Sequence, residues 1–183
     1  MSAKRPPMIT TAPVDGASPV ARETHICDTW VFGYGSLVWR PDFPAAEHVP
    51  AVLFGWKRRL WQGSPDHRGT PDLPGRVATL LADPAAHVHG VAYRLTPGTE
   101  AETLERLDVR EVAGYALLRV PVSLADGRVL TEALVYVATI DNPWFLGPAP
   151  LAEMTSQIRA AVGASGPNHV YIERLASALA AMG

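Results

Sequence analysis

A glycine-rich stretch near the start of the apolar sequence has the composition of a turn that can bind an anion. It comprises Phe32, Gly33, Tyr34, Gly35, Ser36 and Leu37. Small residues in a turn let backbone N–H groups approach an anion closely. The spacing fits neither a dinucleotide fingerprint nor a phosphate loop, because Val38 replaces the third glycine and no Gly-Lys pair follows. Ser36 is not in a G-x-S-x-G elbow, so an anion-binding turn and an ordinary tight turn both remain open.

Glu111 is the most informative single position. Leu104, Leu107 and Glu111 stand at i, i+3 and i+7, which places a carboxylate at the end of the core-facing stripe of a helix. An inward carboxylate costs free energy unless a cation neutralises it or its altered pKa serves acid–base chemistry. The residues leave both alternatives open. A structural ion pair would use Arg76, Arg94 or Arg110.

The loop between Trp61 and Gly69 gathers a hydroxyl, a carboxylate, an imidazole and a guanidinium. These belong to Ser64, Asp66, His67 and Arg68. A catalytic triad is one interpretation, but its three members are too close in sequence to adopt the required geometry easily. A surface loop capped by its own Asp and Ser is favoured. Arg68 is a candidate ligand for a substrate carboxylate, with a structural arginine as the alternative.

Metal ligands are sparse in the sequence. His87 and His89 lie on one face of a predicted strand, but no third ligand stands at a supporting spacing. The single cysteine, Cys27, excludes a disulfide framework within the chain and a multi-cysteine metal site. We therefore expect no metal and no cofactor, and the reducing environment of the cytoplasm fits best.

The elements that must position these residues are mostly short strands. Segments rich in β-branched and aromatic residues, separated by Pro, Gly, Asp and Asn, predict strands from Trp30 and at 51–54, 57–61, 77–81, 88–95, 115–122 and 129–139. A T-x-x-E capping box at Thr99 and Glu102 predicts a helix running towards Arg110. Apolar residues at helical spacing predict two C-terminal helices, separated by a break at 163–167. They are Leu151, Met154, Ile158 and Val162, then Ile172, Leu175, Leu179 and Met182.

This order of elements predicts an α+β fold. Consecutive strands with one inserted helix favour a small mixed or antiparallel, barrel-like sheet with flanking helices. The 183 residues suit one core, and residues 1–28, rich in Pro, Ala, Ser and Thr, predict a flexible leader before a single domain over 29–183.

Charge and hydropathy exclude several classes of partner. A net charge of −2 offers no basic field for nucleic acid. No stretch approaches the roughly 20 apolar residues of a membrane helix, and the N-terminus lacks a secretory signal. We therefore expect neither nucleic acid nor a membrane as a partner, while the oligomeric state stays open.

The motifs taken together resemble the ChaC-like γ-glutamylcyclotransferases, in their glutathione-degrading branch, from Trp30 to about Leu179. Eight blocks occur in order, among them V-F-G-Y-G-S-L-V-W, R-R-L-W-Q-G-S-P-D-H-R-G, P-G-R-V, G-V-A-Y-R-L and L-D-V-R-E. D-N-P, L-G-P-A-P-L and S-G-P-N complete the set. The chain departs from its relatives in a longer leader and in Trp144-Phe145, where a tyrosine is frequent before L-G-P.

The resemblance implies a barrel-like α+β fold in which the glycine loop and the L-D-V-R-E glutamate meet in one cavity. It implies that Glu111 is the acid–base residue and that the stretch 32–37 cradles the γ-glutamyl group. The implied substrate is glutathione, whose α-amino group attacks its own γ-carbonyl carbon, closing 5-oxoproline and releasing Cys-Gly. Arg68 and Arg76 are then candidate partners for the glycine carboxylate.

Two alternatives accompany this interpretation. A cyclotransferase acting on other γ-glutamyl amines would share the chemistry. A non-catalytic γ-glutamyl-binding module would keep the glycine loop but could lose the inward carboxylate, so the presence of Glu111 argues for an enzyme.

The composition of the leader generates a first prediction. Deletion of residues 1–24 should leave the melting temperature and glutathione turnover unchanged, because the segment has few large apolar groups to bury. Thermal unfolding and a turnover assay of the two proteins check this. A loss of stability above about 2 kcal/mol would contradict it, since fraying ends contribute less.

Overall fold

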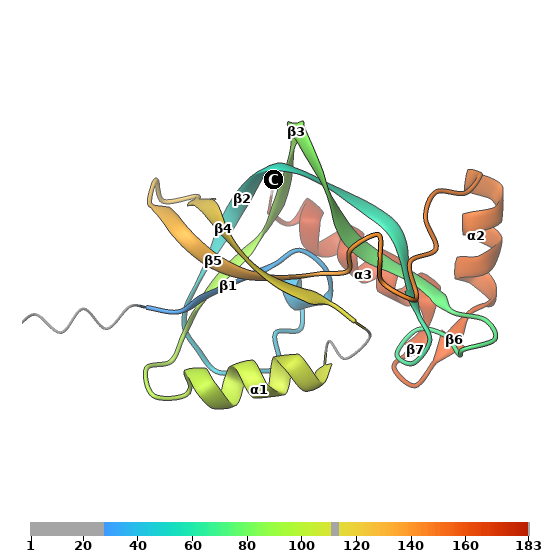
Figure 1. Ribbon diagram of the computed structural model, residues 1–183, viewed down its shortest axis with the longest axis horizontal. Helices are drawn as coiled ribbons and strands as arrows, with labels where there is room; N and C mark the ends of the chain where they lie inside the picture. The colour runs from blue at the N-terminus through green and yellow to red at the C-terminus, as the bar shows by residue number, and fades with distance from the viewer. Residues whose placement is uncertain (1–27, 111–113, 183) are drawn as a thin grey trace, which may run out of the picture.

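The structure is a computed structural model that describes residues 28–110 and 114–182 (Figure 1). Most of the expected leader and Glu111 lie outside the described residues. The elements in chain order are β1 (Trp30–Gly33), the 3-10 helix η1 (Ser36–Val38), β2 (Ala45–Ser64), β3 (Gly75–Leu95), α1 (Glu100–Arg110), β4 (Ala116–Leu124), β5 (Val129–Val137), α2 (Leu151–Ala160), β6 (Val162–Gly163), β7 (Gly166–Pro167) and α3 (Asn168–Ala180).

The main sheet is a closed barrel with the strand order β1-β3-β2-β4-β5. Neighbouring strands are antiparallel except β1 and β5, which pair in parallel at Val31 and Leu134 and close the barrel. The predicted α+β class and the mixed, barrel-like sheet are thus confirmed. In the barrel part, closure removes the free sheet edges that would allow unwanted pairing.

The prediction of separate short strands is wrong in two places. Segments 51–54 and 57–61 belong to the continuous strand β2, and 77–81 and 88–95 belong to β3. Gly55, at φ +82°, and the Asp83-Pro84 pair were interpreted as strand ends. They form an irregularity instead, where the register jumps from Phe54 opposite His87 to Trp56 opposite Ala82. The two strands keep pairing on both sides of it, so the pair bends without ending.

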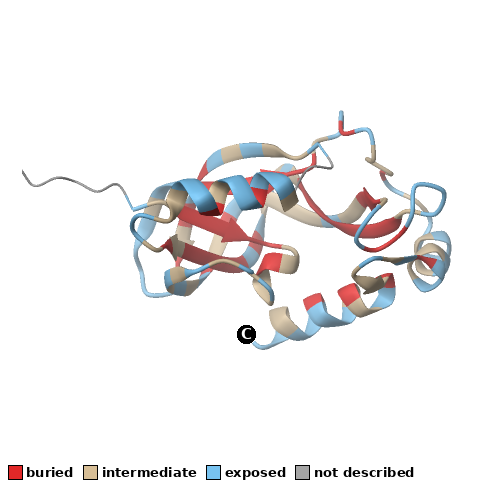
Figure 2. Cartoon of the chain, turned by 90° about the horizontal axis from the view of Figure 1, so that it is seen from below, coloured by how far each residue is buried: buried red, intermediate tan, exposed pale blue. Residues whose placement is uncertain are grey.

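The core has two parts. The larger fills the barrel and extends to α3, through residues such as Leu53, Leu80 and Tyr171. The smaller lies under α1, where Leu107 packs with Val31, Leu95, Leu134 and Tyr136. Figure 2 shows α1 crossing the buried strands with its exposed side outward.

The start of α1 differs in detail from the predicted capping box. The helix begins at Glu100, directly after Thr99, but the Thr99 hydroxyl donates to the Thr96 carbonyl at 2.9 Å. The carboxylate that accepts a backbone N–H belongs to Glu100, which binds Gly98 at 2.7 Å. The side chains of Thr99 and Glu100 therefore bond to the turn before the helix and do not form the reciprocal pair of a capping box.

The two predicted C-terminal helices are present, but each ends earlier than predicted. Helix α2 stops at Ala160, so Val162 lies in β6 and is 54% exposed. The predicted break holds a small hairpin of β6 and β7. Helix α3 ends at Ala180, before Met182. Its buried residues are Asn168, Tyr171 and Leu175, and α3 packs on β3 and η1.

Candidate functional site

A cavity of about 430 Å³ lies between the glycine loop, the end of β2, the end of α1 and the start of α3. Its size falls in the range of about 300–1,000 Å³ that is usual for small-molecule sites. Its lining residues include several tyrosines, Trp39 and the arginines at positions 40, 68, 106 and 110. The arrangement suits a small, anionic molecule with a polar backbone.

The glycine loop forms one wall of this cavity. Phe32, Tyr34, Gly35, Ser36 and Leu37 line it, as expected. Gly33 is not among the lining residues, since it ends β1 and pairs with β3. A side chain at Gly33 would stand 2.7 Å from the Leu37 Cβ, so the chain can fold back here only because this residue is glycine.

Buried hydrogen bonds fix the loop from two sides. The Tyr34 hydroxyl donates to the Tyr136 carbonyl at 2.8 Å, and the Tyr93 hydroxyl donates to the Leu37 carbonyl at 2.7 Å. The Arg58 Nε donates to the Tyr34 carbonyl at 2.9 Å. Burial raises the pKa of Tyr93 to about 12, so this hydroxyl keeps its proton and its bond at neutral pH.

At one end of the cavity, arginines converge on the segment after η1. Arg110 and Arg106 of α1 donate to carbonyls of this segment, Arg110 to Arg40 and Pro41, and Arg106 to Asp42 at 2.9 Å. The Asp42 carboxylate lies 2.7 Å from the Arg40 Nε and 3.6 Å from the Arg110 Nη1. Asp42 has φ +57°, a left-handed conformation that Asp tolerates better than most residues. These contacts hold α1 against the glycine loop.

The polar loop after β2 forms the opposite wall. Ser64 donates to the Asp66 carboxylate at 3.0 Å and accepts the Arg68 N–H at 3.1 Å, so the loop is capped by its own side chains. The His67 ring contacts the Ser165 hydroxyl at 3.0 Å. These partners support the capped-loop interpretation over a triad of Ser64, Asp66 and His67.

Arg68 lines the cavity and is 6% exposed. Its Nη1 donates to the carbonyls of Ser165 and Pro167 at 2.8 and 3.3 Å, and its guanidinium lies 5.8 Å from the centre of the Tyr171 ring. Burial lowers the pKa of Arg68 from its ordinary value, and the neighbouring Arg174 adds to this effect. Part of the guanidinium thus holds the β6–β7 segment in place.

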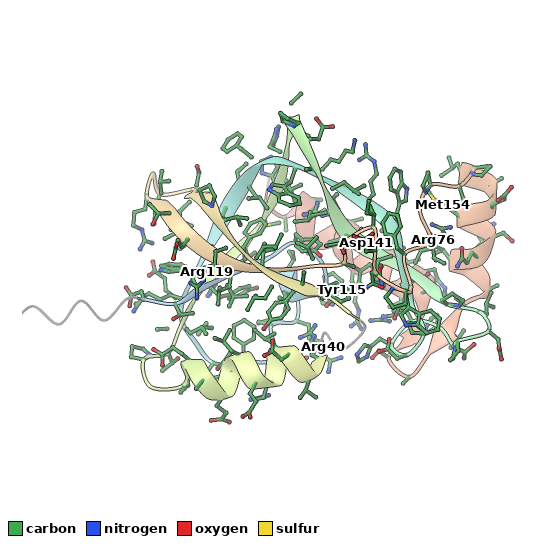
Figure 3. All side chains as sticks on the ribbon, in the orientation of Figure 1. Arg40, Arg76, Tyr115, Arg119, Asp141 and Met154 are labelled. Atoms are coloured by element: carbon green, nitrogen blue, oxygen red, sulfur yellow. The ribbon has the colours of Figure 1, made fainter. Side chains whose placement is uncertain are left out.

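Arg76 is not among the residues that line the cavity, and its guanidinium donates hydrogen bonds to other parts of the protein. Its Nε donates to Gln157 at 2.7 Å, and its Nη1 donates to the carbonyls of Leu60 and Gly147 at 3.1 Å each. Figure 3 places Arg76 beside Met154 of α2, away from Arg40. The structure therefore shows Arg76 as a link between β3 and the α2 region.

Glu111 lies outside the described residues, so its interactions are not given. The described residues Arg110 and Tyr115, on either side of segment 111–113, both line the cavity. Beyond it, the Gly114 carbonyl accepts the Asn142 side-chain N–H at 2.8 Å, and Gln62 donates to the Asn142 side-chain oxygen at 3.0 Å. Buried Gln62 and Asn142 thus hold the chain where it enters β4.

Potential metal ligands do not gather into a site in the part of the chain that the structure describes. No group of three or more His, Cys, Asp or Glu residues there is placed to hold an ion. The rings of His87 and His89 lie 5.2 Å apart on β3. Among the helices of the described residues, none is both long enough and apolar enough to cross a membrane.

Comparison with known proteins agrees with this geometry. Residues 29–183 match the family described as ChaC-like protein. The chain belongs to this family.

Relatives of this ChaC-like chain include named enzymes. It is 45% identical to glutathione-specific gamma-glutamylcyclotransferase 1 of Danio rerio, over 80% of this chain and 76% of the relative. It is 43% identical to gamma-glutamylcyclotransferase 2-3 of Arabidopsis thaliana, over 84% and 81%. Among solved structures, a yeast gamma-glutamyl cyclotransferase specific to glutathione matches with a TM-score of 0.79 and 35% identity, covering 83% of this chain and 86% of that one.

Several residues that line the ChaC-like cavity were missed as site residues in the sequence, among them Tyr171 and Arg110. Tyr171 of α3 is 4% exposed, lines the cavity and accepts the Ala78 N–H at 3.0 Å. Its spacing to Leu175 is helical, which could have placed it on the inner face. Arg110 was considered only as an ion-pair partner, although it reaches Ser36 across the cavity wall at 2.7 Å. No local pattern marks that contact, because the residues are 74 positions apart.

The contacts of Arg76 generate a second prediction. Arg76→Lys keeps the charge but replaces the forked guanidinium by one ammonium group. Loss of these partly buried hydrogen bonds should lower the free energy of unfolding by about 1–3 kcal/mol. Chemical denaturation measures the change.

The matched control is Arg59→Lys on β2. The Arg59 side chain is exposed and its Nη1 donates to the carbonyl of its neighbour, Arg58. Its replacement should change stability by less than about 0.5 kcal/mol. Equal stability of the two variants would argue against the structural role of Arg76.

Proposed function

We propose that this protein is a glutathione-specific γ-glutamylcyclotransferase. The observation that carries the proposal is a cavity lined by the glycine loop and by several arginines, in a chain 45% identical to an enzyme of that name. We assign the catalytic unit to residues 29–183, the span of the family match, and its location to the cytoplasm on the sequence argument above.

The reaction is an internal acyl transfer. The neutral α-amine of the γ-glutamyl residue attacks its γ-carbonyl carbon and forms a tetrahedral oxyanion. The attacking nitrogen, now positively charged, gives up a proton. The bond to the cysteine nitrogen then breaks, its electron pair stays on that nitrogen, and a proton is added there. The products are 5-oxoproline and Cys-Gly, and no water is consumed. The protein must hold the curled substrate, move a proton and stabilise the oxyanion.

The chain offers residues for each task. Glu111 takes the ammonium proton and returns one to the leaving nitrogen. The support is its place in L-D-V-R-E, between cavity-lining Arg110 and Tyr115. Backbone N–H groups of segment 33–37 bind the γ-glutamyl end. Arg68, at the opposite wall, is our candidate for the glycine carboxylate, in preference to Arg76, which does not line the cavity and donates to Gln157 and Gly147.

None of these steps needs an enzyme nucleophile or a bound metal. The proposed enzyme therefore works without a cofactor. The broader cyclotransferase activity remains the second candidate function, favoured by the 43% identity to a plant enzyme whose name specifies no glutathione.

A turnover assay tests the function directly. Purified protein incubated with reduced glutathione should release equal amounts of 5-oxoproline and Cys-Gly, and the rate should survive exhaustive chelation because no step uses a metal. γ-Glu-Ala should react much more slowly, since it lacks the glycine end whose binding holds the reactive conformer. Equal kcat/KM for the two substrates would favour the broader activity, and no product would refute the proposal.

Removal of the Glu111 carboxylate provides the next prediction. Glu111→Gln keeps the volume of the side chain but cannot accept the ammonium proton, so kcat should fall by about 10²–10⁴. Glutathione binding and the melting curve should stay nearly unchanged. Steady-state assays of 5-oxoproline, with calorimetric binding and thermal unfolding, measure all three.

Glu105→Gln is the control, because Glu105 is an exposed residue of α1. It removes the same charge and should retain the parent rate. If Glu111→Gln unfolds, or retains more than about a tenth of the rate, Glu111 is not the base.

A further inference from the structure

Arg110 makes a hydrogen bond that neither the sequence nor the proposed reaction accounts for. From the last turn of α1, its Nη2 donates to the Ser36 hydroxyl oxygen at 2.7 Å. Both residues line the cavity. The bond therefore joins the helix that leads into Glu111 to the first residue of η1, inside the wall that faces the substrate.

The direction of this bond determines what Ser36 can do. A guanidinium has donors and no acceptor, so the Ser36 oxygen must accept. Its proton must then point elsewhere. Within residues 28–110 and 114–182, no atom accepts the Ser36 hydroxyl proton, while the Ser36 carbonyl accepts the N–H groups of Trp39 and Arg40. The hydroxyl of this cavity-lining residue is thus left as a donor.

Arg110 makes further contacts with its other guanidinium nitrogen. Nη1 donates to the carbonyls of Arg40 and Pro41 and lies 3.6 Å from the Asp42 carboxylate. A guanidinium engaged in this way is a fixed charge behind the hydroxyl. Hydrogen bonds in a chain polarise one another, so the Ser36 hydroxyl becomes a stronger donor.

A neutral donor of this kind discriminates between states of the reaction. It binds a ground-state carbonyl weakly and an oxyanion strongly, and only such a difference accelerates the chemical step. A carboxylate present throughout the reaction is better met by a charged partner. Ser36 is therefore suited to the oxygen on which negative charge develops.

We propose that Arg110 is a positioning residue that fixes the Ser36 hydroxyl as a donor to the γ-carbonyl oxygen of the substrate. As the amine nitrogen bonds to the carbonyl carbon, the π pair moves onto that oxygen and the Ser36 hydrogen bond shortens. When the pair returns, the bond to the leaving nitrogen breaks. Ser36 neither forms a covalent bond nor loses its proton. This inference rests on the proposed function.

Arg106 offers a matched control on the same helix. It stands four residues before Arg110, carries the same charge and donates to the Asp42 carbonyl in the same segment. Ser36 is not among its partners in the described chain. Arg106→Gln thus removes one charge and one tether of α1 and leaves the Ser36 contact in place.

A double-mutant cycle tests the coupling. The four proteins are the parent, Arg110→Gln, Ser36→Ala and the double variant, each assayed for kcat and KM with glutathione. Each single change should lower kcat about 10- to 100-fold, the lower part of the range for loss of an oxyanion donor, with KM within about threefold. The double variant should be no slower than Ser36→Ala, because Arg110 acts through that hydroxyl.

The outcomes separate the inference from the function on which it rests. If the parent releases no 5-oxoproline, the proposed function fails. If the parent is active but the two losses multiply, or fall on KM alone, Arg110 does not act through Ser36 on the oxyanion. A loss of kcat in Arg106→Gln as large as in Arg110→Gln would also overturn the inference, by assigning the effect to charge or tethering. Unfolding of Arg110→Gln, with kcat of Ser36→Ala within threefold of the parent, would overturn it as well.

Discussion

The antiparallel pairing of β2 with β3 runs from Ala45 opposite Leu95 to Ser64 opposite Gly75. One end of this pair belongs to the barrel, where β3 receives β1 and β2 receives β4. The other end projects beyond it and carries the polar loop that forms a cavity wall. Because the same two strands span both regions, on either side of the irregularity at Gly55, the strand pair that helps to build the core also places the wall. The glycine loop follows β1, which pairs with β3, so the same pair of long strands positions both walls of the cavity.

Some of the arginines near the cavity hold the protein's own loops in place. Arg58 and Arg76 donate mainly to backbone carbonyls of the protein, and burial lowers the pKa of both. An arginine can bridge several carbonyls at once, because its donors lie in a fixed plane. Such a residue holds segments that have no regular secondary structure between them. The loops around this cavity therefore take their shape from cations as well as from apolar packing.

The sequence predicted what depends on local pattern. Alternation and turn residues located the strands, and the run of strands with one inserted helix predicted the barrel. Gly55 and Pro84 were misinterpreted as strand ends, because a residue that breaks a strand looks the same as one that only bends it. The pairing partner decides between these two cases, and it lies about thirty positions away along the chain.

In the site too, the sequence predicted the features that depend on local residue types and missed those that depend on long-range contacts. The glycine loop and the loop around Arg68 were identified from residue types alone, and both line the cavity. Arg76 was indistinguishable from Arg68 in sequence, since both are arginines beside turn residues. Only the positions of Gln157 and Gly147 show that Arg76 is engaged elsewhere. Long-range contacts of this kind leave no periodic signal.

The β6–β7 hairpin has a consequence for how the protein is made. Ala164 and Ser165 donate their N–H groups to the carbonyls of Asp66 and His67, and a side chain at Gly163 would stand 2.5 Å from the Gly69 nitrogen. A chain leaving the ribosome thus exposes the polar loop about a hundred residues before the segment that holds it. The barrel strands can pair first, but the cavity wall has its partner only after the hairpin emerges. The cavity therefore takes its full shape only after the β6–β7 segment has been synthesised.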